Sequence, residues 1–247
     1  APQLFTSMDS TFIDLYSKSG LYMTEIVKRL FKGLAPGIPD EQERVRWILE
    51  EQVFACAPSD IIYNMVKNYV YGGFPGVNTD NLMKLDLIPA AKEGRLAEEL
   101  RKGMKKDVKF DAIIGNPPYQ VMDGGAQASA VPVYQYFVSQ AKKTNPAYIS
   151  LIMPSRWYAG GKGLNDFRKE MQADKRIKEI YDFHDSTDLF PGVFVKGGIC
   201  YFLWDIEYQG DCKVHNSILG SISSTKRSLL TEGTDVFIRF NQMLPIF

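Results

Sequence analysis

The stretch Phe110-Asp111-Ala112-Ile113-Ile114-Gly115-Asn116-Pro117-Pro118-Tyr119 decides how the rest of the sequence is interpreted. Its apolar residues 112–114 predict a short buried strand, and the two prolines end that strand because they have no N–H donor. Asn116 then offers a side-chain acceptor, Pro117 a backbone carbonyl of nearly fixed conformation, and Tyr119 a flat aromatic face. Two acceptors beside an aromatic ring suit a planar ligand with an exocyclic amino group. A plain Pro-Pro turn after a strand is the alternative interpretation.

Length and composition predict one domain that covers residues 1–247, because 247 residues with 45% hydrophobic content can bury a substantial core. The 29 basic and 29 acidic residues cancel, which does not support a stand-alone DNA binder held by phosphate contacts. The three cysteines lack metal-ligand spacing, so we expect reduced thiols, no metal and a cytoplasmic location. No apolar run approaches the ~20 residues of a membrane-spanning helix, so we expect no membrane contact. The chain begins at Ala1 without a methionine, and we expect a fragment of a longer protein.

The first structural unit of the sequence is a strand, a turn and a helix. Residues 11–16 predict the strand, and the Ser/Gly-rich residues 17–20 predict a sharp turn before the helix. Such a unit begins a doubly wound α/β sheet. Asp14 at the carboxyl end of the strand can accept hydrogen bonds from a cationic amino group. The turn is not a phosphate-binding loop, because Lys18 is misplaced for that motif.

The remaining pattern continues the alternation of strands and helices. Further strands are expected at residues 52–57, 81–88, 148–153, 177–183 and 198–204, and helices at residues 39–49, 60–70, 90–106, 131–143 and 164–172. The last strand follows its predecessor with no crossover helix between them, so we expect it to be antiparallel. Residues 120–130 are small and polar, and they suit a mobile loop over a site.

This combination resembles the S-adenosylmethionine-dependent DNA methyltransferases that modify the N6 amino group of adenine. More narrowly, it resembles the methylase part of type II restriction–modification proteins that join cleavage and methylation in one chain. The resemblance rests on a cofactor turn at 14–20, an acidic residue near the cofactor adenine at Asp86, the catalytic motif at 116–119, and the segments 154–157 and 190–192. It implies a Rossmann-like class I methyltransferase fold of the α/β class. That fold has a seven-stranded, mostly parallel sheet with an antiparallel last strand and helices on both faces.

The resemblance also implies the activity and the residues that perform it. The expected reaction transfers a methyl group from S-adenosylmethionine to the N6 amino group of an adenine flipped out of double-stranded DNA, as part of a restriction–modification system. The expected catalytic residues are Asn116, Pro117, Pro118 and Tyr119. The expected cofactor-binding residues are Asp14, Leu15, Ser17, Gly20, Asp60, Asp86 and Asn116. The expected base-stacking residues are Tyr119, Phe194 and Phe202, with core packing as the alternative for the two phenylalanines. Phosphate contacts are expected from Arg156, Lys162 and Lys196, with solvated charge as the alternative.

The sequence departs from the family pattern at several points. Lys18 stands where many members have glycine, and Ala57 stands where an acidic residue commonly holds the cofactor ribose, a role that Asp60 would take over. The N-terminal cofactor segment is expected to be truncated and the target-recognition domain absent. Two other functions remain open: methylation of a protein glutamine side chain, and a non-catalytic subunit that binds cofactor or DNA.

Overall fold

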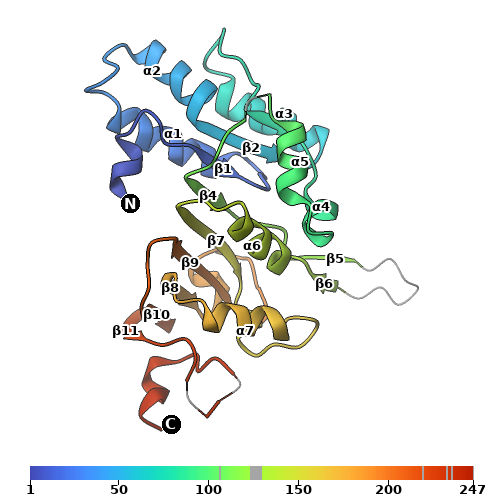
Figure 1. The fold of residues 1–247 in the computed structure, drawn as a ribbon, viewed down its shortest axis with the longest axis vertical. Coiled ribbons are helices and arrows are strands. Elements are labelled where there is room, and N and C mark those ends of the chain that lie inside the picture. The colour runs from blue at the N-terminus through green and yellow to red at the C-terminus, as the bar shows by residue number, and fades with distance from the viewer. Residues whose placement is uncertain (106, 123–129, 219, 232, 235, 247) are drawn as a thin grey trace. The chain divides into compact units, whose positions relative to one another are not determined.

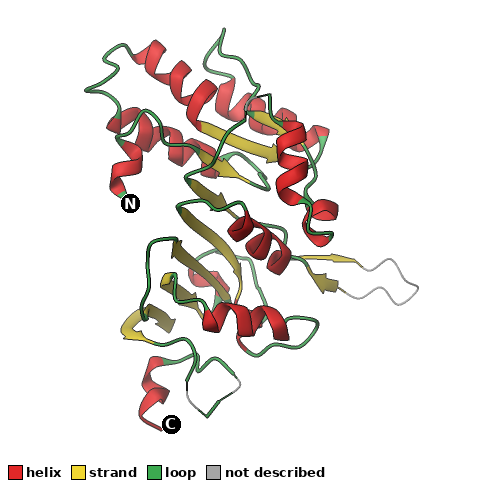
Figure 2. Cartoon of the chain, in the orientation of Figure 1, coloured by secondary structure: helices red, strands yellow, loops and turns green. Residues whose placement is uncertain are grey.

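The computed structural model describes residues 1–105, 107–122, 130–218, 220–231, 233–234 and 236–246. The chain divides into two compact units, residues 1–117 with 140–147 and residues 118–139 with 148–247. Both units contain strands and helices (Figures 1 and 2).

The first unit holds four parallel strands in the order β4-β1-β2-β3. These strands are β1 (Phe12–Asp14), β2 (Val53–Ala57), β3 (Leu82–Lys84) and β4 (Ala112–Gly115). Every residue of β1 and β2 is buried, as continuous apolar runs predict for strands inside a parallel sheet. The helices of this unit are α1 (Leu21–Gly33), α2 (Glu41–Trp47), α3 (Asp60–Val66), α4 (Ile88–Lys92) and α5 (Leu96–Gly103), with π-helical turns at Ile48–Gln52 and Lys67–Tyr71 and a 3-10 turn at Pro2–Phe5.

Three predicted elements of the first unit were wrong in extent. The strand expected at 11–16 is the shorter β1, which ends at Asp14. The single helix expected at 90–106 is two helices, because Gly94 adopts a left-handed φ of 77° between α4 and α5. The strand expected at 81–88 ends at Lys84, so that Asp86 lies in the loop beyond it. There its carboxylate accepts the backbone N–H of Ile88 at 3.0 Å.

The second unit holds five strands in the order β11-β10-β8-β9-β7. These are β7 (Tyr148–Pro154), β8 (Ile177–Phe183), β9 (Ile199–Asp205), β10 (Cys212–Ile218) and β11 (Ser221–Arg227). Strand β9 is antiparallel to both β7 and β8, as expected from its spacing. Strand β10 is parallel to β8, and β11 is antiparallel to β10. Helix α7 (Asn165–Ala173) and the 3-10 turns η4 (Ser155–Tyr158), η5 (Ser186–Asp188) and η6 (Asn241–Ile246) belong to this unit, and α6 (Tyr134–Lys143) begins in it.

Strands β10 and β11 were not predicted. Strand β10 buries polar residues, so its sequence lacks the apolar run that indicates a buried strand. His215, Asn216 and Ser217 are all buried. The buried amide of Asn216 is hydrogen-bonded: it donates to the carbonyl of Arg239 at 3.0 Å and accepts the N–H of Asn241 at 3.0 Å. Tertiary partners of this kind remove the cost of burying a polar group, and they leave no periodic signal in the sequence.

The loop expected at 120–130 also contains regular structure. Strands β5 (Gln120–Met122) and β6 (Ala130–Pro132) pair antiparallel, whereas residues 123–129 lie outside the described part of the chain. The fold class is confirmed as mixed α/β with mostly parallel strands, although there are more strands than the seven predicted. Within the described ranges, no helix combines the length and apolar character needed to cross a membrane.

Candidate active site

The candidate site of the first unit lies where its parallel strands end. Parallel strands present their carboxyl ends at one edge of a sheet, which is where ligands of open α/β folds bind. The register pairs Phe12 with Ala112 and Ile13 with Ile113, so β1 and β4 end side by side. Asp14 is the last residue of β1, and Asn116 follows the last residue of β4. The fold thus places Asp14 and Asn116 at the ends of two neighbouring strands.

Gly115 allows the Asp14 carboxylate to lie directly against β4. A Cβ atom at position 115 would stand 2.5 Å from Asp14 Oδ1, closer than side-chain packing permits. From the sequence, Gly115 was predicted only as part of a strand end, and its contact with Asp14 was not predicted. A glycine directly before Asn-Pro-Pro was the available signal, but its meaning depends on the neighbouring strand.

The turn after β1 is fixed by backbone contacts. The N–H of Ser17 donates to the carbonyl of Cys56 in β2 at 2.8 Å, and the N–H of Tyr16 donates to Asp14 Oδ1 at 3.1 Å. Leu15 and Ser17 are buried in this turn. Gly20 begins α1 with a left-handed φ of 83°, and a Cβ there would lie 2.8 Å from Val70 Cγ2. Glycine is therefore required for both the backbone conformation and the packing of the turn.

Asp14 affects the ionisation of several neighbouring groups at this edge of the sheet. Asp14 is 2% exposed, and burial raises the pKa of its carboxyl group to about 7, although the hydrogen bond from the Tyr16 N–H lowers that pKa. Burial lowers the pKa of Lys18 while the Asp14 charge raises it, and burial together with that charge raises the pKa of Tyr22 to about 12. A buried carboxylate with a raised pKa is typical of a functional site, and a bound cation would favour its charged form.

Asn116 presents the acceptor that the sequence analysis assigned to it. Its Oδ1 atom is buried and has no hydrogen-bond partner within the described part of the chain. Leaving a buried polar atom unpaired is costly, so a ligand that supplies the missing donor would be favoured at this position. Pro117 and Pro118 are buried, and Tyr119 is half-buried. The carbonyl of Tyr119 accepts the N–H of Val133 at 3.1 Å, which joins the residue before β5 to the residue after β6.

The two remaining acidic residues differ in their surroundings. Asp86 raises the pKa of Tyr16 in addition to the effect of burial, so its carboxylate lies near the turn after β1. Asp60 is exposed and forms an ion pair with Lys84 at 2.9 Å. Ala57 is buried, and its carbonyl accepts the N–H of Leu85 at 2.8 Å. Asp60 is thus paired with Lys84, the last residue of β3, and its ribose role stays a prediction.

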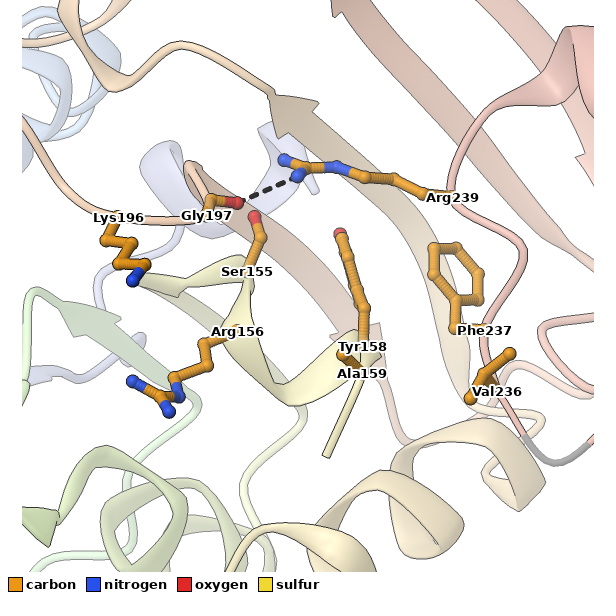
Figure 3. A pocket seen from close by; sticks show the side chains of 9 residues that line it. All are labelled: Ser155, Arg156, Tyr158, Ala159, Lys196, Gly197, Val236, Phe237 and Arg239. Carbon is orange, nitrogen blue, oxygen red and sulfur yellow. Dashed lines mark hydrogen bonds between the residues drawn. The ribbon is translucent and has the colours of Figure 1, made fainter. Parts of the chain in front are cut away.

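In the second unit, two of the three expected phosphate-binding cations line one pocket of about 420 Å³ (Figure 3). Arg156 and Lys196 lie at one side of it, and Tyr158, Val236 and Phe237 form an apolar wall. The third cation, that of Lys162, lies within 3.5 Å of the carbonyl of Ala130 and does not line this pocket.

The two candidate base-stacking phenylalanines have opposite environments. Phe194 is 79% exposed, whereas Phe202 is 1% exposed in β9. The burial of Phe202 favours core packing over base stacking for that residue. Phe194 retains a free aromatic face. Across the described residues, no group of three or more His, Cys, Asp or Glu side chains is placed to hold a metal ion.

We expect Gly115→Ala to weaken binding of the expected cofactor by about tenfold, because the added methyl group must displace the Asp14 carboxylate. Isothermal titration with S-adenosylmethionine measures the effect. Gly73→Ala is the matched control, since nothing lies within 4 Å of a Cβ at that position. Unchanged affinity in Gly115→Ala would show that the contact with Asp14 has no part in binding.

The sequence of this chain matches known methylases. Residues 51–190 match the family described as Eco57I restriction-modification methylase. An uncharacterized adenine-specific methylase of Mycoplasma pneumoniae is 27% identical over 290 residues, covering 92% of this chain and 69% of that protein.

Solved structures share the fold at low sequence identity. A nuclease-deletion mutant of the Type ISP restriction-modification enzyme LlaGI, in complex with a DNA substrate mimic, gives a TM-score of 0.64 at 12% identity, over 97% of this chain and 25% of its own. The ATP-dependent Type ISP restriction-modification enzyme LlaBIII bound to DNA gives 0.60 at 14% identity, over 86% of this chain and 18% of its own. The chain spans a quarter or less of these two enzymes.

Proposed function

Because the chain belongs to the Eco57I restriction-modification methylase family, we propose that it transfers a methyl group from S-adenosylmethionine to the N6 amino group of adenine in double-stranded DNA. The observation that carries this proposal is the buried Asn116 Oδ1 atom, which has no partner in the described ranges and lies one residue beyond β4. The reaction would modify host DNA within a restriction–modification system.

The residues at the edge of the first unit fit the proposed cofactor. Asp14, buried and with a raised pKa, would accept hydrogen bonds from the cationic amino group, and Gly20 would let the helix start approach the ligand. Asp86 would lie near the adenosine part, since its charge already reaches the turn after β1. S-adenosylmethionine supplies a methyl group on a sulfonium that is already activated, so the protein needs neither a nucleophile nor a metal for this step.

The chain's own contribution is to prepare the adenine nitrogen. The N6 lone pair is delocalised into the ring and is a poor nucleophile. If Asn116 Oδ1 and the Pro117 carbonyl accept its two hydrogens, the nitrogen moves toward tetrahedral geometry and its lone pair points at the methyl group. These contacts strengthen as positive charge develops on the nitrogen, so they stabilise the transition state more than the ground state.

A base inside a duplex cannot reach these acceptors and must be flipped out. Tyr119 would stack on one face of the extruded adenine, and the exposed ring of Phe194 is the candidate for the other face. Arg156 and Lys196, which line one pocket of the second unit, would contact phosphates.

We expect Tyr119→Ala to slow methyl transfer by roughly ten- to a hundredfold, because stacking on an aromatic ring contributes about 1–3 kcal/mol per base. Tyr119→Phe and Tyr119→Trp should retain most of the activity, since each keeps an aromatic face. Single-turnover methylation of a cognate oligonucleotide measures the rate. An equally slow Tyr119→Phe enzyme would show that the hydroxyl, rather than the ring, is what matters.

Transfer of a labelled methyl group tests the proposal itself. The full-length protein is incubated with labelled S-adenosylmethionine, double-stranded DNA and a protein extract. Label in N6-methyladenine is the expected result. Label in protein glutamine would replace the proposal with the protein-directed activity, and binding of cofactor without any transfer would indicate a non-catalytic subunit.

A further inference from the structure

The segment between β8 and β9, residues 184–198, carries the candidate base-stacking ring, and we name it the Phe194 loop. Phe194 is 79% exposed in this loop. An apolar ring this exposed gains little from burial, so other contacts have to order the backbone on either side of it. The contacts of that backbone show how this is achieved.

One buried hydroxyl group anchors the backbone on both sides of Phe194. Ser186 is 1% exposed, and its Oγ donates to the carbonyl of Val193 at 2.8 Å and accepts the N–H of Val195 at 2.7 Å. The carbonyl of Ser186 also accepts the N–H of Phe190 at 2.8 Å. The peptide groups immediately before and after the exposed ring are therefore fixed to the same side chain.

One guanidinium group anchors both ends of the Phe194 loop. Arg239 Nη1 donates to the carbonyl of Gly197 at 2.8 Å, the contact drawn in Figure 3, and Nη2 lies 3.4 Å from the carbonyl of Phe183. The remaining donors form a two-pronged ion pair with Asp182, with Nε–Oδ2 2.7 Å and Nη2–Oδ1 2.8 Å. A planar guanidinium can make such a set of contacts in one fixed orientation.

The ion pair is itself held in place. The Asp182 side chain is 1% exposed and also accepts the hydroxyl of Ser155 at 2.8 Å. Burial acts against the charge on Arg239, but the hydrogen bonds and charge of Asp182 outweigh it and raise the pKa of Arg239. Gly198 has a left-handed φ of 81°, and a Cβ there would lie 2.6 Å from Arg239 Nη2. The two ends of the loop therefore meet around Arg239 where only glycine fits.

We propose that Ser186 and Arg239 are positioning residues that hold Phe194 in place to stack against the extruded base. The role rests on the proposed function, and neither residue touches the reacting atoms. A ring on an ordered backbone loses little conformational freedom when a base docks against it, so anchoring the loop in advance favours binding of the flipped state.

Limited proteolysis tests the anchoring without any activity measurement. Chymotrypsin cleaves after Phe194 and trypsin after Lys196, and both sites lie in the loop. We expect Ser186→Ala to be cut there about tenfold faster than the wild type, because only an opened loop enters a protease. Ser10→Ala, a change at another buried serine in the first unit, should leave the rate unchanged. Equal cleavage of Ser186→Ala and wild type would overturn the anchoring.

Arg239→Gln alone would leave Asp182 buried without its charge partner, so the informative variant combines it with Asp182→Asn. This neutral pair should also open the loop to trypsin. If the loop of a folded double variant were as resistant as that of the wild type, the ion pair would have no part in holding it.

A double-mutant cycle then tests the purpose of the anchoring in the full-length protein. Ser186→Ala and Phe194→Ala should each lower kcat/KM for duplex DNA about tenfold, with unchanged cofactor affinity, and their combination should be no worse than Phe194→Ala alone. DNA with a mismatch opposite the target adenine should recover part of the lost rate. If the enzyme is active and the effects of Ser186→Ala and Phe194→Ala on kcat/KM are additive, the positioning role of Ser186 is overturned and the proposed function is not. A wild type that transfers no methyl group to DNA would overturn the proposed function and this role together.

Discussion

Replacement of Asn116 by alanine in the full-length protein is expected to lower the rate of methyl transfer roughly a hundred- to a thousandfold, while cofactor affinity stays within a few-fold. The lost side-chain oxygen would be a positioned acceptor for one hydrogen of the adenine amino group. By analogy with the removal of one oxyanion-hole donor, this costs about 3–4 kcal/mol in the transition state. Single-turnover methylation of a cognate oligonucleotide gives the rate, and titration calorimetry gives the cofactor affinity.

The same substitution should not destabilise the folded protein. Asn116 Oδ1 makes no hydrogen bond within the described residues, so alanine breaks no hydrogen bond of that atom and removes the desolvation cost of a buried polar group. The melting temperature should stay level or rise. Asn64→Ala, at an exposed position of α3, is the control for the loss of an asparagine elsewhere in the first unit. A stable Asn116→Ala enzyme with full activity would exclude adenine methylation through this motif.

The elements that were predicted best from the sequence are those determined by neighbouring residues in the chain, without contacts to distant segments. Strand β8 begins and ends at the expected residues, 177 and 183, and β9 is antiparallel, as expected for a connection without a crossover helix. Gly115 and the two prolines likewise marked the end of β4. In each case the decisive property is local: a buried apolar run, a connection without a crossover helix, or a missing N–H donor.

The features that the sequence did not predict depend on residues far apart in the chain. Asp14 and Gly115 are about a hundred positions apart, and neither shows that the carboxylate lies against the glycine. Arg239 reaches back to Asp182 and Gly197 in the same way. Phe194 and Phe202 are alike in the sequence, yet only the register of β9 decides that Phe202 is buried. Sites built from such contacts become visible only once the fold is known.

Replacement of Asp14 by asparagine is expected to weaken S-adenosylmethionine binding on the order of a hundredfold, because removing one partner of a buried charge pair costs about 2–5 kcal/mol. Asparagine keeps the shape and can still accept the Tyr16 N–H through its amide oxygen. The pH dependence identifies the charge. With the Asp14 pKa at about 7, wild-type affinity should fall toward tenfold per pH unit below pH 7, whereas the variant should show no such slope.

The same change should stabilise the protein without its cofactor. The folded-state pKa of Asp14 is raised from 3.8 to about 7, so the stability associated with the neutral carboxyl is present below pH 4 and lost as the pH rises toward 7. A neutral asparagine avoids that loss. Asp14→Asn should therefore exceed the wild type in free energy of unfolding at pH 8, by up to about 4 kcal/mol, and match it near pH 4. Urea denaturation at the two pH values measures this difference. A variant that is less stable at pH 8 would mean that the Asp14 carboxylate stabilises the sheet edge. A variant that binds cofactor as tightly as the wild type would mean that Asp14 does not bind a cationic group of the ligand.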